Sequence, residues 1–188
     1  MRYEKGRKEA SRDRIIEVAT QRFRTDGIAA SGLAGIMAEA GLTNGAFYPH
    51  FPSKTALVRD CVSKALETQA DQLREAVKTG GLEAVIDLYL SAAHRDNPGK
   101  GCASATLLPE LARAPSDTRQ AYTEDLQALA RNLSAELPPR CPDPEAATFA
   151  IFATLVGTLQ LARAVEGPDL SDRILEAGKQ AARRLARP

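Results

Sequence analysis

The sequence lacks tryptophan, and only 5% of its 188 residues are aromatic. Its three cysteines, Cys61, Cys102 and Cys141, are an odd number at wide spacing, which favours neither a disulfide framework nor a zinc knuckle. Because His50 and His94 are the only histidines, we expect no structural metal site. We find no zinc-protease motif, nucleophile elbow, Walker loop or dinucleotide-binding loop, so we expect no enzymatic activity and no cofactor.

The sequence also lacks a long run of alternating apolar and polar residues, which excludes a sheet as the main element. Together with many alanines and leucines, this predicts an all-α protein. The basic N-terminus has no apolar segment, so we expect a cytoplasmic protein without a membrane partner. The charge-free run 146–162 is at the short limit for crossing a bilayer, which takes roughly 20 residues, and it contains several threonines. We interpret it as a buried helix.

The segment from Ser31 to Lys54 predicts two short helices joined by a tight turn. Ser31 is expected to cap the first helix, and Gly41 follows its last apolar position, where a left-handed residue commonly ends a helix. Thr43 is expected to cap the second helix. Pro49 lacks a backbone donor and is expected to end or kink this helix near its last turn.

Two longer helices are expected on either side of this pair. The first follows Ser11 and ends at Asp26 and Gly27. The second begins after Pro52 and Ser53, and a single apolar stripe continues along it. The stripe consists of Leu57, Val58, Cys61, Val62, Ala65, Leu66, Leu73 and Val77.

From Arg12 to Leu66 the chain resembles the N-terminal domain of the TetR family of bacterial one-component transcriptional regulators. The resemblance rests on an ordered set of positions: Ile16, Ala19, Phe23, Gly27, Ser31, Ile36, Ala40, Gly41, Gly45, Tyr48, His50, Phe51, Ser53, Lys54 and Leu57. Met37 and Pro49 differ from the residues common in the family, but the order and spacing of the matching positions are unchanged.

The resemblance implies a helix-turn-helix DNA-binding domain of three helices in residues 1–52. It also implies a larger helical domain for effector binding and dimerisation in residues 53–188, about nine helices in all. In the family, the last two long helices pair with their copies as a four-helix bundle. We therefore expect a homodimeric repressor that binds a palindromic operator and is released by a small-molecule effector. The alternative is a ligand-independent DNA-binding or architectural helical protein.

By resemblance, the helix from Thr43 to His50 enters the major groove, where base edges present distinct donors and acceptors. The predicted DNA-binding residues are Ser31, Thr43, Asn44, Gly45, Ala46, Tyr48, His50 and Lys54. Of these, Asn44 is the main candidate for a base contact, and Ser31, Thr43, Tyr48 and Lys54 are candidates for phosphate contacts. Phe47 and Phe51 are excluded because they are expected to pack in the core.

The charge of the chain is unevenly distributed. Residues 1–60 contain ten Lys and Arg against seven Asp and Glu. Most of the excess lies in residues 1–14, where the cations are Arg2, Lys5, Arg7, Lys8, Arg12 and Arg14. Two interpretations stay open: a solvated, disordered start, or an arm that touches phosphate or the minor groove.

Glycine and proline divide the remaining chain into helices. These are expected at Leu82–His94, at Ala103–Ala112, from Ser116 to Pro138, after the cap Asp143, and from Ser171 to about Leu185. The helix after Asp143 is expected to have a small-residue face and a bulky face. The bulky face, which includes Phe149 and Phe152, is expected to point to the core.

The resemblance also implies a ligand cavity in the larger domain. Candidate lining residues are Tyr89, His94, Cys102, Tyr122, Phe149 and Phe152. For the four aromatic rings, plain core packing is the competing interpretation. Two interpretations of Cys102 also stay open: a reactive thiol that senses electrophiles or oxidants, or an inert packing residue.

Overall fold

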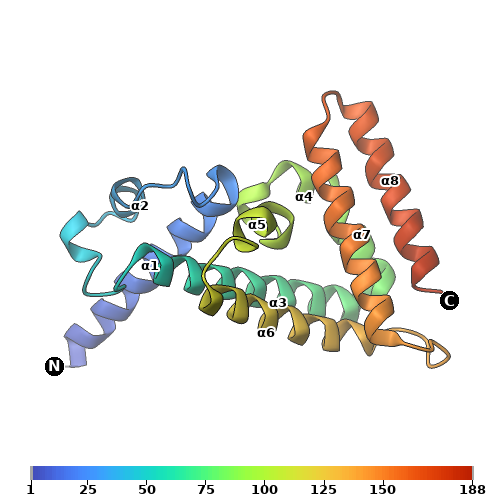
Figure 1. The fold of residues 1–188 in the computed structure, drawn as a ribbon, viewed down its shortest axis with the longest axis horizontal. Coiled ribbons are helices and arrows are strands. Elements are labelled where there is room, and N and C mark those ends of the chain that lie inside the picture. Colours follow the sequence, from blue (N-terminus) through green and yellow to red (C-terminus); the bar gives the residue numbers. More distant parts are fainter. Residues whose placement is uncertain (1, 188) are drawn as a thin grey trace.

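The computed structural model describes residues 2–187 and is helical throughout, which confirms the predicted all-α class (Figure 1). No strand occurs in this described range. In chain order the elements are α1 (Arg2–Asp26), α2 (Leu33–Glu39), the 3₁₀ turn η1 (Asn44–Ala46), α3 (Lys54–Tyr89), α4 (Ala92–Asp96), the 3₁₀ turn η2 (Pro98–Lys100), α5 (Ser104–Leu111), α6 (Ser116–Ser134), α7 (Pro144–Ala164) and α8 (Pro168–Leu185).

The elements form two groups, and α3 connects them (Figure 1). We call α1, α2 and η1 the head, and α3 to α8 the body. The head encloses a small core that includes Phe23, Ile36, Phe47 and Phe51, and it is closed by the first turns of α3 and by α5. The body has its own core, built from α3, α5, α6, α7 and α8. The long helix α3 therefore contributes to both cores.

The ends of α1 and α2 differ in part from the prediction. The helix α1 begins at Arg2 and continues through Ser11, so the described start of the chain is helical rather than disordered. It ends at Asp26, as predicted, and Gly27 follows with φ 86°, a left-handed conformation that favours glycine. Gly32, not Ser31, is the N-cap of α2. The Ser31 hydroxyl instead donates to the Gly27 carbonyl at 2.7 Å, which ties the loop to the end of α1.

The expected helix from Thr43 to His50 is shorter than predicted. Only the 3₁₀ turn η1 forms, and the chain then closes into tight turns in which the His50 and Phe51 amides both donate to the Phe47 carbonyl. Pro49 explains the difference, because it supplies no N–H and disfavours helical backbone at the residue before it. We call residues 43–50 the recognition turn.

The helix α3 begins as predicted at the cap Ser53, whose hydroxyl accepts from the Ala56 amide at 3.1 Å. It is interrupted at Gly80 and Gly81, where Gly81 has φ 62°. The predicted continuation to His94 is wrong, because the helix ends at Tyr89. Ser91 then caps the short helix α4 by accepting from the His94 amide at 3.1 Å.

Two other predicted helix starts shift. Pro115 rather than Ser116 is the N-cap of α6, without a side-chain bond. The helix α8 begins at Pro168, a favourable first position, and Ser171 lies buried inside it, donating to the Ala162 carbonyl at 2.7 Å. The predicted cap Asp143 is confirmed, since its carboxylate accepts from the Ala146 amide at 2.9 Å.

The helices α7 and α8 form an antiparallel pair at the end of the body far from the head (Figure 1). They approach closely at Gly178, where a Cβ atom would lie 2.2 Å from the Thr158 methyl group. By length and composition α7 could cross a membrane, but Leu155 and Leu159 on its inner face are buried in the body core.

Each helix of this pair carries a row of accessible small and apolar residues. On α7 the row consists of the exposed or half-exposed residues Ala146, Phe149, Ala150, Ala153, Gly157, Leu161 and Ala164. On α8 it consists of Leu170, Ile174, Ala177, Ala181 and Leu185. We call these two rows the α7/α8 stripe. Phe149 belongs to the stripe and is 38% exposed, so its predicted position in the core is wrong. The helix turns Phe149 outward because Thr148, Ile151 and Phe152 occupy the buried side.

Candidate nucleic-acid interface and effector cavity

Aromatic packing on the inner side of the recognition turn attaches it to the core of the head. Phe47 is 1% exposed, and its ring lies 5.6 Å from the Phe51 ring in a stacked pair. The next residue, Tyr48, is 70% exposed and meets Phe47 edge-on at 5.4 Å. Adjacent residues therefore point in opposite directions, one into the head and one into solvent.

The predicted DNA-binding residues within the turn are mostly accessible. Thr43, Asn44, Gly45 and Tyr48 are exposed, and Ala46 is half-buried. The structure thus brings these five residues together on one outer surface of the head. Asn44 offers both a donor and an acceptor there, as a contact with a base edge requires.

His50 lies differently from the other residues of the turn. It is half-buried, and its Nδ1 atom has no hydrogen-bond partner among the described residues. Burial lowers the pKa of His50, and the charges of Lys8 and Arg12 lower it further. The ring is therefore neutral near pH 7, and its Nδ1 atom is buried rather than on the outer surface.

Two of the predicted phosphate contacts are engaged inside the head. Ser31 is fully buried, with its hydroxyl bonded to Gly27. The Lys54 ammonium donates to the Ile28 carbonyl at 2.6 Å and lies 6.0 Å from the centre of the Phe23 ring. In this conformation both residues fix the loop between α1 and α2 and so position the recognition turn.

The basic start of α1 is partly paired. Arg12 forms an ion pair with Asp60 at 2.5 Å and lies 5.1 Å from the Phe51 ring centre, which attaches α1 to α3. Arg14 pairs with Glu17. Arg7 and Lys8 are exposed and remain candidates for phosphate contact, whereas the side chains of Arg2 and Lys5 lie outside the described residues.

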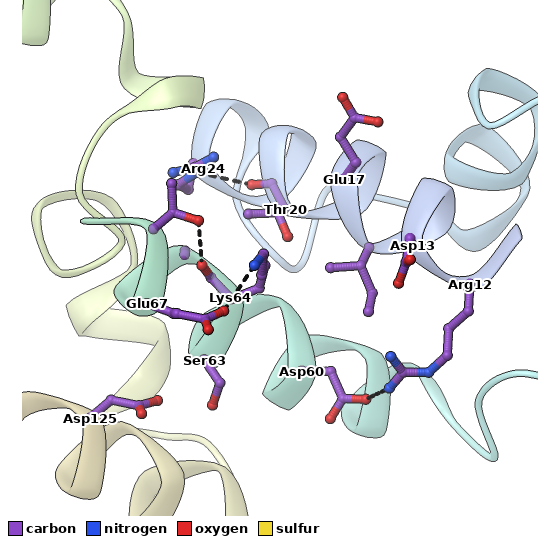
Figure 2. A pocket seen from close by; sticks show the side chains of 13 residues that line it. Arg12, Asp13, Glu17, Thr20, Arg24, Asp60, Ser63, Lys64, Glu67 and Asp125 are labelled. Atoms are coloured by element: carbon purple, nitrogen blue, oxygen red, sulfur yellow. Dashed lines mark hydrogen bonds and ion pairs between the residues drawn. The ribbon is translucent and has the colours of Figure 1, made fainter. Parts of the chain in front are cut away.

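A groove of about 830 Å³ lies between α1, α3 and α6 (Figure 2). Five carboxylates and three cationic side chains line it, and Figure 2 shows the pair Arg12–Asp60 between α1 and α3 and the pair Lys64–Glu67 along α3. Burial raises the pKa of Asp125 on the α6 wall. An excess of carboxylates repels phosphate, so the groove is unsuited to face DNA. The recognition turn is the better candidate.

A second cavity, of about 770 Å³, lies in the body between α3, α4, η2 and the residues Gly101 and Cys102 that follow η2. We call it the body cavity. Three of the predicted ligand-binding residues, Tyr89, His94 and Cys102, line it together. Its apolar lining includes Leu73 and Ala76 from α3. The helix break after Tyr89 lets α4 fold back beside α3 and so shapes this cavity.

His94 connects two walls of the body cavity. Its Nε2 atom accepts from the Cys102 amide at 3.0 Å, so the Nδ1 atom carries the proton and donates to the Tyr89 carbonyl at 2.7 Å. The ring also meets Tyr89 edge-on at 4.8 Å. Burial lowers the pKa of His94, the charges of Arg163 and Arg24 lower it further, and the Tyr89 carbonyl opposes the shift. The bond that Nε2 accepts from the Cys102 amide requires the neutral form of the ring.

We expect this linkage to make the protein less stable in mild acid. Because the folded state lowers the pKa of His94, its contribution is complete above the ordinary histidine pKa of about 6.5 and is lost as the pH falls below that value. Urea unfolding between pH 5 and pH 8 measures the effect. His94→Gln should flatten the pH dependence while His50 still titrates. An unchanged slope in this variant would contradict the assignment.

The other three predicted cavity residues lie elsewhere. Tyr122 hydrogen-bonds to Ser104 at 2.9 Å and packs against the head core. Phe149 is on the α7/α8 stripe. Phe152 is buried behind the cavity wall, with its ring 6.1 Å from that of Tyr89. Helical spacing alone could not distinguish residues that line the cavity from residues that pack elsewhere, because it does not specify which element covers each face of a helix.

Gln69 is a cavity residue that the sequence analysis missed. It is 5% exposed and lines the body cavity from α3. A signal was present, since Gln69 occupies an inward position between Leu66 and Leu73 in the apolar stripe of this helix. A polar side chain at such a position calls for a partner.

The turn η2 touches the head and the body cavity at once. Gly99 packs so closely on α1 that a Cβ atom there would lie 2.6 Å from the Thr25 hydroxyl. Arg24 of α1 donates to the Gly101 carbonyl at 2.6 Å. Lys100 and Gly101 also line the body cavity. A displacement of this cavity wall therefore acts directly on α1.

The described geometry defines a class of protein: an all-helical chain with an exposed helix-turn-helix head and a cavity-bearing helical body. Residues 15–61 match the family model described as bacterial regulatory proteins, tetR family. This segment, which contains the helix-turn-helix of the head, is similar to that family, and the TetR-like fold of the whole chain supports a DNA-binding transcriptional regulator. A comparison with curated proteins finds no match.

Solved structures share the fold over nearly the whole chain. The reduced form of NemR from E. coli superposes with a TM-score of 0.76 at 18% identity, covering 93% of this chain and 96% of that one. A TetR-family regulator from Cytophaga hutchinsonii gives 0.78 at 19%, covering 95% and 96%. FadR from Bacillus subtilis, solved in complex with stearoyl-CoA, gives 0.65 at 19%, covering 88% and 96%.

Proposed function

We propose that the protein is a homodimeric repressor that binds a palindromic operator in the cytoplasm and is released by a small-molecule effector. The observation that supports this most is η2, because one short turn belongs to the wall of the body cavity and packs on α1 of the head. A ligand in the cavity can therefore bias the position of the recognition turn. We keep the proposed division into a DNA-binding domain of residues 1–52 and an effector and dimerisation domain of residues 53–188.

The α7/α8 stripe supports the homodimer. It extends along both helices with exposed alanine, leucine and phenylalanine side chains, and Leu161 alone is 60% exposed. Small residues at the spacing of one helix face let two helices approach closely. A two-fold axis through this surface buries the same stripe from both copies in a four-helix bundle and gives the assembly two heads.

For DNA recognition we assign different roles to the residues of the head. Asn44, Gly45 and Ala46 face the base edges, and Thr43 and Tyr48 contact phosphate or bases. His50, Ser31 and Lys54 act mainly by positioning, because their polar groups face the interior of the head. Arg7 and Lys8 add cationic contacts along the backbone, which makes binding depend on salt.

The proposed switch is a shift between populations. The dimer samples different spacings of its two heads, and only one spacing matches half-sites about one helical turn, roughly 34 Å, apart. An effector that binds the other arrangement more tightly lowers operator affinity. A coupling of roughly 1 to 3 kcal/mol corresponds to a change of about 5- to 150-fold. Two elements would transmit ligand binding from the body cavity to the head: α3, which belongs to both cores, and η2.

Operator selection from random duplexes with the purified protein tests the proposal. We expect one palindromic site, with Asn44→Ala relaxing specificity at a single position in each half-site by roughly 1 to 3 kcal/mol. Gel-shift titrations on single-base variants of the selected site measure this. Equal weakening on every sequence would instead assign Asn44 to the phosphate backbone.

A salt series distinguishes the alternative, an architectural protein without a ligand switch. A specific dimer keeps its selected site well above bulk DNA as salt rises, whereas an architectural protein shows little sequence preference at any salt concentration. Little preference would exclude the repressor assignment, and a preserved preference would exclude the architectural one.

A further inference from the structure

Two buried polar side chains line the body cavity close to each other, without a hydrogen bond of standard geometry in the described structure. Gln69 is 5% exposed and Tyr89 is 2% exposed. The Gln69 amide oxygen, the Gln69 amide nitrogen and the Tyr89 hydroxyl all lie buried without a hydrogen bond. Both side chains line the cavity. Buried polar groups are nearly always hydrogen-bonded. Three unbonded atoms at one cavity therefore indicate that a bound molecule supplies their missing hydrogen bonds.

The remaining polar groups of the inner cavity are already engaged. Both ring nitrogens of His94 are bonded, one to the Tyr89 carbonyl and one to the Cys102 amide. Arg24 and Arg163 lie outside the lining and donate to backbone carbonyls. The charged side chains that line the cavity, Glu75 and Lys100, are exposed and of opposite sign. The buried part of the lining is therefore neutral.

The three unbonded atoms of Gln69 and Tyr89 also limit the chemical class of a ligand that could bind them. The Gln69 nitrogen requires an acceptor and the Gln69 oxygen requires a donor. Burial raises the pKa of Tyr89 well above its usual value, so this hydroxyl stays neutral and can donate or accept. A carboxylate has no donor for the Gln69 oxygen, and an ammonium has no acceptor for the Gln69 nitrogen. An ammonium would also lie near the charges of Arg163 and Arg24, and either ion would lose its hydration on burial.

We infer that the effector is a neutral amphiphile whose head group both donates and accepts hydrogen bonds, such as a carboxamide or a hydroxyl, bound by Gln69 and Tyr89. Its apolar part lies against the α3 face formed by Leu73 and Ala76. The inference rests on the proposed function in one respect, that the body cavity is the effector site. It adds the chemical class of the ligand and the two side chains that recognise it.

Matched eight-carbon probes test this inference: octanamide, octanoate and octylamine, titrated calorimetrically into the full-length protein at pH 7.5. We expect octanamide to bind, with octanoate and octylamine at least about tenfold weaker, since an unpaired buried charge costs more than 1.4 kcal/mol. Gln69→Leu and Tyr89→Phe should each weaken octanamide binding several-fold. Gln127→Leu, an exposed change on α6, is the matched control and should bind as the wild type does.

Thermal unfolding without ligand supplies a second measurement. Gln69→Leu should raise the melting temperature, because it removes two unpaired buried atoms, while Tyr89→Phe still tests recognition if the first variant misfolds. The inference is overturned if an ionic probe binds as tightly as octanamide, if octanamide gives no binding up to its solubility limit, or if both cavity variants bind it normally.

Operator binding is measured separately, by fluorescence anisotropy on the selected duplex. If the protein binds its operator but ignores octanamide, the ligand class fails and the regulator assignment stands. If octanamide binds through Gln69 and Tyr89 but operator affinity does not change, the ligand class stands and the proposed release mechanism fails.

Discussion

Leu161→Glu is expected to convert the dimer into a monomer and to lower operator affinity by roughly 10² to 10⁴, because two linked heads bind two half-sites far more tightly than one head binds one. Leu161 is 60% exposed in the last turn of α7, within the α7/α8 stripe, so a glutamate is harmless in the isolated chain. In the proposed dimer the same side chain would be buried in the interface, where the two carboxylates would lose their hydration and repel each other.

Sedimentation velocity and gel-shift titration on the selected operator measure the two effects. Gln127→Glu adds the same charge to an exposed position on α6 and should change neither. Leu161→Ala should weaken the dimer much less than the glutamate does, since it keeps the surface apolar. A dimeric Leu161→Glu protein with normal operator affinity would show that the chains associate through another surface.

The neighbours Phe47 and Tyr48 are expected to respond in opposite ways to truncation. Phe47→Ala removes a ring that is 1% exposed and stacked on Phe51, so it should destabilise the head by about 3 to 5 kcal/mol and abolish operator binding. Tyr48→Ala removes a ring that is 70% exposed, so it should change stability by less than about 0.5 kcal/mol while lowering operator affinity.

Denaturant unfolding followed by circular dichroism, combined with operator titration, separates the two variants. Tyr48→Phe is the control that keeps the ring and removes only the hydroxyl, which tells whether that hydroxyl contacts phosphate. The assignment of the recognition turn would be wrong if Phe47→Ala stayed fully folded and bound the operator normally, or if Tyr48→Ala bound it as tightly as the wild type.

The sequence predicted the fold class and the helix-turn-helix order because these depend on local chemistry. Helical periodicity, the cap at Ser53 and the left-handed Gly27 are all set by residues close together in the chain. The end of α3 at Tyr89 was not predictable in this way, since nothing between Leu82 and His94 is a strong helix breaker. There the fold of the whole body, rather than local propensity, decides where the helix stops.

The candidate sites were predictable to different degrees. The recognition turn is a short local element, so most of its residues lie together on the surface as expected. Ser31 and Lys54 differ because their partners, Gly27 and Ile28, are specified by the path of a loop rather than by a sequence pattern. The body cavity needed the tertiary structure, since it combines residues of α3, α4 and η2, and the position of Phe149 was predicted wrongly for the same reason.

The position of η2 has a practical consequence for sensor engineering. Contacts that would select a ligand, such as those of Gln69 and Leu73, lie on α3, whereas contacts that would transmit its presence, such as Gly99 against Thr25, lie in η2. If the proposed function holds, separate side chains determine specificity and signal output. A designer could retarget the protein to a new analyte by substitutions on α3 alone and leave its genetic output intact.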